Sequence, residues 1–113
     1  MTVRETLLHV MDATNGRLLE TAAKGDQRRF EDDDVFRCAI AYLWLRLSEP
    51  ATQLLSQRLV SPSVAREWSI LTSIRNSLAH LPDDEIDYDQ LWDLLPTLPM
   101  SVGQDVDRLL ACG

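Results

Sequence analysis

The sequence predicts an all-α protein, with a single domain of 113 residues folded as a bundle of four to five helices. Nineteen leucines stand against eleven valines and isoleucines together, and leucine favours helices whereas β-branched residues favour strands. The chain has only four glycines, too few for the turns of a many-stranded sheet. With 45% hydrophobic residues, a chain of this length can build one core without a metal or a disulfide.

The first helix is expected from Val3 to Ala23, because apolar residues recur there at three- and four-residue spacing. Its inward stripe is Leu7, Leu8, Met11, Leu18 and Leu19. The segment from Lys24 to Phe30 has no such period and predicts a connection. In that connection Gly25 is expected to cap the first helix, and Phe30 to anchor the loop to the core.

The second helix is the most hydrophobic part of the chain. It is expected from Val35 to Leu59, after N-cap and first-turn carboxylates at Asp32, Asp33 and Asp34. A helix that is apolar nearly all round must be covered on more than one side, either by neighbouring helices or by another subunit. Pro50 should kink or split this helix, because proline removes one hydrogen bond and clashes with the preceding turn.

A third helix is announced by Ser61 as N-cap and Pro62 in the first helical position. Pro82 disfavours helical geometry at the residue before it, so the helix should end near residues 79 to 81. The core stripe of this helix is expected to be Val64, Trp68, Leu71 and Leu78.

Two short helices complete the prediction. The first is expected at about Tyr88 to Leu95, and Pro96 with Pro99 predicts a break after it. The last helix is expected from Ser101 to Ala111.

The net charge of −7 lies entirely in the last third of the chain. Residues 1 to 75 contain ten basic and ten acidic residues, whereas residues 76 to 113 contain eight acidic residues and only Arg108. The acidic run from Asp83 to Asp93 lacks the glycine that a calcium loop needs and is most simply a solvated helix start. This balance argues against nonspecific binding of nucleic acid, which requires a basic surface.

Cysteine use and hydropathy predict a cytoplasmic protein. Cys38 and Cys112 form neither a disulfide scaffold nor a metal-ligand spacing, which favours a reducing compartment. The longest nearly apolar segment is interrupted by Arg37 and Arg46, so no membrane insertion is expected. No nucleophile elbow or Gly-rich phosphate loop occurs, and no metal or cofactor is expected.

Arg75 does not fit the pattern of the third helix, because it falls in the apolar stripe between Leu71 and Leu78. One interpretation is structural: the stem packs while the guanidinium reaches solvent or pairs with a carboxylate such as Glu49. The other is functional, since the planar fork of arginine suits a phosphate at an anion site near a subunit boundary. Both interpretations stay open at this point.

His80 follows five residues later and lies about 140° away from Arg75 around an uninterrupted helix. The two side chains converge only if the helix end turns His80 inward, as Pro82 allows, or if a second copy of the helix contributes across a two-fold axis. The helix C-terminus and the acids at 83 to 85 favour a protonated imidazole, which suits a general acid. The alternative is an exposed capping histidine, and His9 is most simply a surface residue.

Residues 73 to 92, SIRNSLAHLPDDEIDYDQLW, resemble the HEPN superfamily, and within it the HepT-like toxins encoded beside a minimal nucleotidyltransferase (MNT) antitoxin. The family signature is an arginine, four residues and a histidine, with a polar residue after the arginine; Arg75, Asn76 and His80 match it. The likeness extends over almost the whole chain, including LLHVMDA in the first helix, LSEPATQLLS in the second and Trp68 upstream of the arginine.

The resemblance implies a helical bundle that forms a homodimer, with the arginine and histidine pairs of both subunits in a cleft at the interface. It also implies a metal-independent endoribonuclease whose product carries a cyclic phosphate. By this resemblance His80 moves a proton at the ribose 2′-hydroxyl or the leaving oxygen, Arg75 stabilises the phosphorane charge, and Asn76 orients one of them or the phosphate. The implied partners are RNA and the nucleotidyltransferase antitoxin.

One position departs from the HepT-like pattern. The family usually carries a tyrosine two residues after the histidine, which the partner enzyme modifies with AMP, and Pro82 stands there in this chain. Modification at that position is excluded, and Tyr88 is the conceivable substitute.

Two functional hypotheses follow. The first is a ribonuclease toxin of a type II or type VII-like toxin–antitoxin module. The second is a catalytically weak HEPN subunit that docks a nucleotidyltransferase partner or serves as its scaffold. The acidic last third supports the second hypothesis because it repels RNA phosphates, although a basic antitoxin can equally cover that face.

Overall fold

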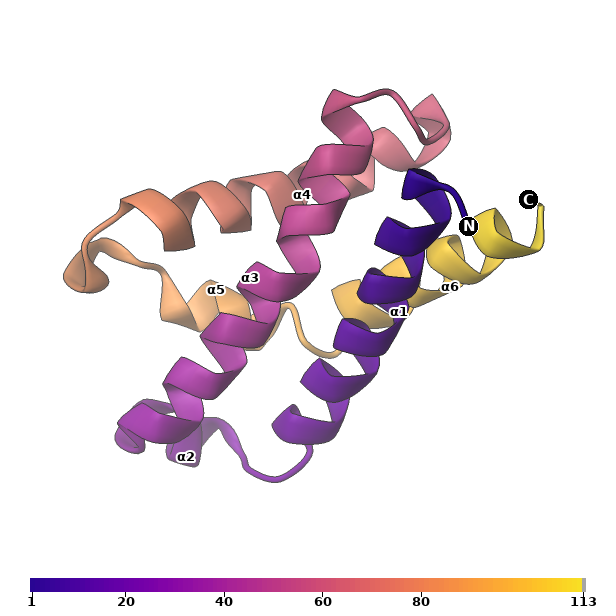
Figure 1. Ribbon diagram of the computed structural model, residues 1–113. Coiled ribbons are helices and arrows are strands. Elements are labelled where there is room, and N and C mark those ends of the chain that lie inside the picture. The colour runs from indigo at the N-terminus through magenta and orange to yellow at the C-terminus, as the bar shows by residue number, and fades with distance from the viewer. Residues whose placement is uncertain (113) are drawn as a thin grey trace.

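A computed structural model describes residues 1–112, which form helices joined by short loops (Figure 1). The α-helices are α1 (Val3–Ala22), α2 (Gln27–Asp32), α3 (Asp34–Ser56), α4 (Pro62–His80), α5 (Tyr88–Asp93) and α6 (Leu98–Ala111), and the 3-10 turn η1 (Asp83–Glu85) lies between α4 and α5. The described residues contain no strand, which confirms the all-α prediction.

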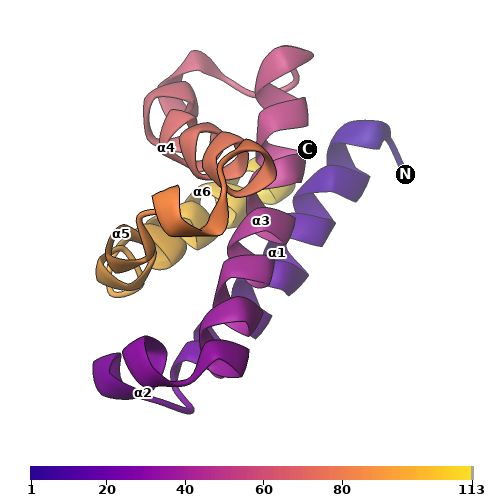
Figure 2. The ribbon, with the colours of Figure 1, turned by 90° about the vertical axis from the view of Figure 1, so that its left-hand side faces the viewer.

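Helix α3 is the centre of the bundle. It runs antiparallel to α1, and α4 crosses it at a steep angle (Figure 1). Helices α2 and α5 also contact α3, and α6 packs against α1 and α4. Neighbours in the same chain therefore cover most of this hydrophobic helix, whereas Val35, Cys38 and Tyr42 on it are exposed, so coverage by another subunit stays a prediction. The C-terminal end of α4 lies at the left edge of the molecule in Figure 1 and faces the viewer in Figure 2.

Two tryptophans fill the core where the helices meet. Trp44 of α3 and Trp68 of α4 are both 0% exposed. The Trp44 indole donates a hydrogen bond to the Leu91 carbonyl (3.0 Å), and the Trp68 indole donates one to Oδ2 of Asp105 (3.2 Å). A buried indole N–H needs such a partner. These bonds tie α3 to α5 and α4 to α6.

Helix α3 continues through Pro50, so the expectation that this proline splits the helix is wrong. Pro50 is buried, and packing between α1 and α4 holds the backbone on both sides of the missing hydrogen bond. The hydroxyls of Ser48 and Thr52 each donate to a carbonyl one turn earlier in the same helix. The helix ends at Ser56, three residues before the expected Leu59.

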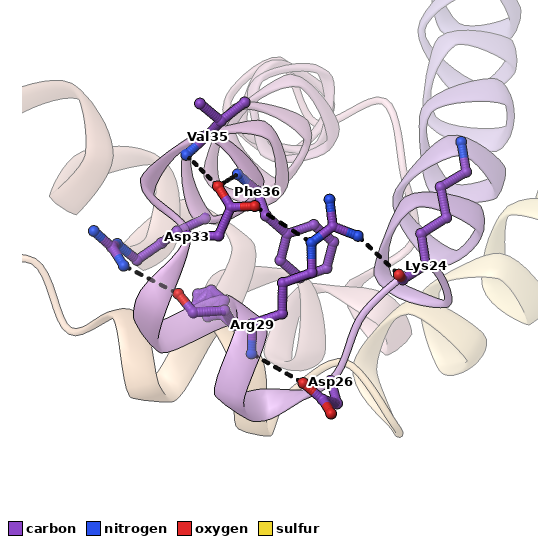
Figure 3. A network of polar contacts seen from close by, with 8 residues as sticks. Lys24, Asp26, Arg29, Asp33, Val35 and Phe36 are labelled. Atoms are coloured by element: carbon purple, nitrogen blue, oxygen red, sulfur yellow. Dashed lines mark hydrogen bonds and ion pairs between the residues drawn. The ribbon is translucent and has the colours of Figure 1, made fainter.

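The expected connection between the first two long helices contains a helix of its own, α2. The side chain of Asp26 caps it by accepting from the Arg29 backbone N–H (2.9 Å), and Phe30 packs into the core with 2% of its surface exposed. The Arg29 guanidinium bonds the Lys24 carbonyl and the Asp33 carboxylate, which joins the end of α1 to the start of α3 (Figure 3). The anchoring role expected of Phe30 is confirmed.

Gly25 does not cap the first helix, because Ala23 occupies the C-cap position. Its role is close packing: a Cβ atom there would lie 2.7 Å from Cζ of Phe36. The start of α3 is capped by Asp33, whose carboxylate accepts from the backbone N–H groups of Val35 and Phe36. The bond from Phe36 is the main reason that the pKa of Asp33 lies below its ordinary value.

The predicted stripes are correct in part. On α1, Leu19 is 39% exposed, and buried Thr14 and Asn15 take the inward positions. On α4, Val64, Trp68 and Leu71 are buried as expected, but the next buried residue is Ile74, and Leu78 is only half-buried.

The last helix begins earlier than expected, at Leu98. Pro99 lies in its first turn and not in a break, because the missing N–H of a proline costs nothing there. Over residues 1–112, no helix combines the length and apolar character required to cross a membrane.

Candidate functional site

The residues of the Arg-x4-His signature lie on the C-terminal end of α4, beyond its last buried residue. Ser61 and Pro62 start this helix as predicted, and Ile74 is the last side chain that it buries. Arg75 is half-buried, whereas Asn76 and His80 are exposed. The signature therefore begins where α4 leaves the core.

Arg75 has a hydrogen-bond partner on its own helix. Its Nη1 donates to Oδ1 of Asn76 at 3.1 Å. Within residues 1–112 no carboxylate lies close enough to form an ion pair with it, so the alternative in which it pairs with a carboxylate such as Glu49 is wrong. A half-buried stem and a surface guanidinium without a counter-ion leave Arg75 able to bind an anion.

His80 borders a shallow hollow of about 460 Å³ on one face of α4. The hollow is lined by Asn76, Ser77, His80 and Leu81, and is called the α4 hollow below. Residues 76, 77, 80 and 81 share a face because they are four or three positions apart on the helix. Arg75 is not among the lining residues.

The helix is regular as far as His80, and Leu81 then turns extended (ψ 145°) ahead of Pro82. The proline therefore does not turn His80 inward, and that route to convergence with Arg75 is wrong. The two side chains lie about 140° apart around one helix. Convergence through a second copy of the helix stays a prediction.

Asn76 is the link between the two ends of the signature. Its amide oxygen accepts the bond from Arg75, and its side chain lines the α4 hollow beside His80. Asn76 therefore bonds the guanidinium of Arg75 and also lines the hollow that His80 borders.

Carboxylates follow the hollow directly. Asp83, Asp84 and Glu85 form η1, three residues after His80, and all three are exposed. Within the described part of the chain, none of them is in an ion pair. Their negative potential favours cations and basic partners at this end of the molecule and opposes free phosphates.

Tyr88 lies on the other side of η1, in a different cavity from His80. This cavity holds about 410 Å³ and is lined by residues of α2, α3, η1 and α5. The Tyr88 hydroxyl donates to Asp83, and the Arg37 guanidinium lies 5.5 Å from the centre of the Tyr88 ring. Burial and the bond with Asp83 raise the pKa of Tyr88 to about 12, so its phenol stays protonated at neutral pH.

Other chemical groups of the described residues lie apart. No cluster of three or more His, Cys, Asp or Glu side chains among residues 1–112 is arranged to hold one metal ion. Cys38 and Cys112 are exposed free thiols, and His9 is exposed on α1, as expected for a surface residue.

Sequence reasoning missed two lining residues of the α4 hollow. Ser77 precedes His80 by three residues, a spacing that places both on one helix face, so this signal was present in the sequence. Leu81 follows Ser77 by four residues, so the same spacing indicates it, although it stands at the C-cap and not inside the helix.

Comparison with known proteins returns no relative: no protein-family model, no curated protein and no solved structure matches the chain. The resemblance to HepT-like toxins therefore rests on the residue pattern of the sequence.

Proposed function

We propose that the chain is a metal-independent endoribonuclease of the HEPN type, acting as the toxin of a type II or type VII-like toxin–antitoxin module. The observation that carries this proposal is the end of α4. There an arginine without a counter-ion is hydrogen-bonded to Asn76, which shares an accessible hollow with His80. An anion-binding group and a proton-transfer group are the two requirements of metal-free phosphodiester cleavage.

In the proposed reaction the ribose 2′-oxygen attacks the adjacent phosphorus, and the bond from phosphorus to the 5′-oxygen breaks. His80 transfers a proton at the 2′-hydroxyl or at the leaving oxygen. Arg75 stabilises the charge that develops on the phosphorane oxygens, and Asn76 holds the guanidinium in place. The products are a 2′,3′-cyclic phosphate and a 5′-hydroxyl, and no bond is oxidised or reduced.

The active form in this proposal is a homodimer. Arg75 and His80 of one chain point to different sides of α4, so Arg75 of one copy meets His80 of a second copy across a two-fold axis. The exposed end of α4 at the edge of the bundle is accessible for this contact (Figure 2). A minimal nucleotidyltransferase antitoxin silences the dimer, with Tyr88 as the conceivable substitute for the tyrosine that the family usually carries two residues after the histidine.

Cleavage of a structured RNA by the purified protein in the presence of EDTA tests the proposal. His80→Ala and Arg75→Ala should each slow cleavage by at least about a hundredfold, the usual contribution of a general acid or a charge-stabilising group. His9→Ala and Arg17→Ala are matched controls, because both residues are exposed on α1, and they should cleave normally. Equal activity of the His80 and His9 variants would remove the catalytic assignment.

A second candidate function is a docking or scaffold subunit for a nucleotidyltransferase. The observation that favours it is η1, whose three exposed carboxylates follow His80 closely and repel an RNA backbone. This function predicts no RNA cleavage, no growth arrest on expression, and a stable complex with the nucleotidyltransferase encoded by the neighbouring gene. Cleavage that depends on His80 would exclude it as the sole function.

A further inference from the structure

The cavity beside Tyr88 is separate from the α4 hollow and is lined by both apolar and acidic side chains. Two segments that are far apart in sequence build it, residues 30–37 and residues 83–89. Its apolar lining comes from half-buried Ile86 and Tyr88 and from Phe30, which is 2% exposed and has its ring centre 5.1 Å from that of Trp92. The rim carries four carboxylates: Glu31, Asp83, Asp84 and Asp89.

Among residues 1–112, one cationic side chain lines the cavity, that of Arg37, and it already has several partners. Arg37 donates to the carbonyls of Phe30 and Glu31 at 3.0 and 2.9 Å, and it also pairs with Asp34 outside the cavity. Its side chain is only 21% exposed. Arg37 therefore joins α2 to α3, and its positive charge offsets one of the four carboxylates, so the lining keeps an excess of three negative charges.

The four rim carboxylates have no cationic partner among residues 1–112. Asp83 accepts from the Tyr88 hydroxyl and Glu31 accepts from the side-chain amide of Gln27, both neutral donors. Asp84 and Asp89 are exposed. A lining that combines apolar side chains with an excess of negative charge is complementary to a long side chain with an apolar stem and a cationic head.

We propose that this cavity is a docking pocket for an arginine side chain presented by a basic protein partner. Arginine fits better than lysine because its planar guanidinium stacks on aromatic rings and bonds carboxylates through two nitrogens at once. The chain itself uses this contact twice nearby, with Arg29 4.4 Å from the centre of the Phe36 ring and Arg37 over Tyr88. An RNA partner does not fit, because the rim repels phosphates.

This inference does not depend on the ribonuclease proposal, since the pocket shares no lining residue with the α4 hollow. It assigns the acidic segment after α4 a role in recognising a partner. The η1 carboxylates then belong to a binding surface next to the proposed active site and not to the active site itself.

The test is a titration of the ¹⁵N-labelled full chain, followed by amide NMR, with the peptide acetyl-Gly-Arg-Gly-amide at low salt. Citrulline in place of the arginine gives a neutral peptide of the same shape. We expect saturable shifts confined to residues 30–37 and 83–92 with the arginine peptide, and none with the citrulline peptide.

Variants that remove carboxylates test whether binding of the arginine peptide requires their negative charge. The double change Asp84→Asn and Asp89→Asn should weaken binding of the arginine peptide by about tenfold or more, because charged hydrogen bonds are lost. The matched control is Asp12→Asn with Asp107→Asn, which removes the same charge from exposed positions on α1 and α6 and should change binding by less than about twofold. Circular dichroism checks that both variants keep the fold of the parent.

Three outcomes would overturn the proposal. Equal binding of the citrulline peptide would show an apolar groove without charge recognition. Equal weakening by the two double variants would show attraction to net charge alone. Tighter binding of spermidine than of the arginine peptide would identify a polyamine site in place of a protein-docking pocket. None of these results bears on RNA cleavage, so the two proposals fail independently.

Discussion

The two ends of α4 have opposite surroundings. Its N-terminal part buries Val64, Trp68, Leu71 and Ile74, whereas its last turns carry half-buried Arg75 and exposed Asn76 and His80. The first set is explained by packing alone. The second set adds little to the core, and the side chain of Arg75 donates its hydrogen bond to the neighbouring residue, Asn76. The difference separates residues that hold the fold from surface residues, to which the proposed function assigns the chemistry.

The largest effect is expected from Trp68→Ala. The change removes a fully buried indole and leaves Asp105 without one of its donors, so the free energy of unfolding should fall by about 3 to 5 kcal/mol. Urea denaturation followed by circular dichroism measures it. A fall in the free energy of unfolding below about 1 kcal/mol would mean that the N-terminal part of α4 does not pack into the core as described.

At the other end of the helix, His80→Ala should leave stability unchanged within about 0.5 kcal/mol, because the side chain is exposed and has no hydrogen bond within the described residues. The same variant should no longer arrest growth when expressed. Growth curves and thermal denaturation of one preparation give both values. Unfolding caused by His80→Ala would make the residue structural and erase the contrast between the two ends.

Asn76→Ala tests the proposal that Asn76 acts by holding the guanidinium of Arg75 in place. Arg75 keeps its charge but loses its hydrogen-bond partner, so RNA cleavage should fall by about tenfold, less than for Arg75→Ala. Ser73→Ala, an exposed change on the same helix, is the control. A loss as large as that of Arg75→Ala would place Asn76 among the reacting groups.

The smallest expected effect is a change in the pH dependence of stability, and it concerns Glu67 in the N-terminal part of α4. Burial and hydrogen bonding to Asp105 raise the pKa of Glu67 above its ordinary value of 4.5. A raised folded-state pKa stabilises the protein below the unfolded value, and this contribution is lost as the pH rises through the folded value. Glu67→Gln, which does not titrate, should therefore raise the Tm at pH 7 and lose this advantage near pH 4.

The control for that change is Glu20→Gln, at an exposed position of α1. Thermal denaturation of both variants across this pH range measures the effect. An equal gain in Tm for the two variants would contradict a specific interaction between Glu67 and Asp105.

Sequence patterns predicted the long helices because their signals are local. Ser61 with Pro62 and then Pro82 marked both ends of α4, and the leucine stripe marked α1. Helix α2 was missed because six polar-rich residues have no period, and its stability comes from the Asp26 cap and the burial of Phe30. The N-cap signal of Asp26 was present in the sequence, but the burial of Phe30, which is a tertiary contact, decides whether the helix forms.

Tertiary contacts also decide how far a buried stripe extends along its helix. Leu78 was expected inside and Ile74 was not, because α4 crosses α3 at a steep angle and leaves the core before its own end (Figure 1). The angle between Arg75 and His80 followed from helix geometry alone. The cavity beside Tyr88 could not be predicted in this way, since its lining joins residues 30–37 to residues 83–89.

The most direct test of the central claim, that two copies of α4 complete one site, mixes two inactive proteins. Arg75→Ala and His80→Ala are combined, unfolded and refolded together, and assayed for RNA cleavage. If the site pairs Arg75 of one copy with His80 of the other, half of the dimers regain one of two sites and activity returns to about one quarter of the parent. Activity no higher than that of either variant alone would contradict the claim.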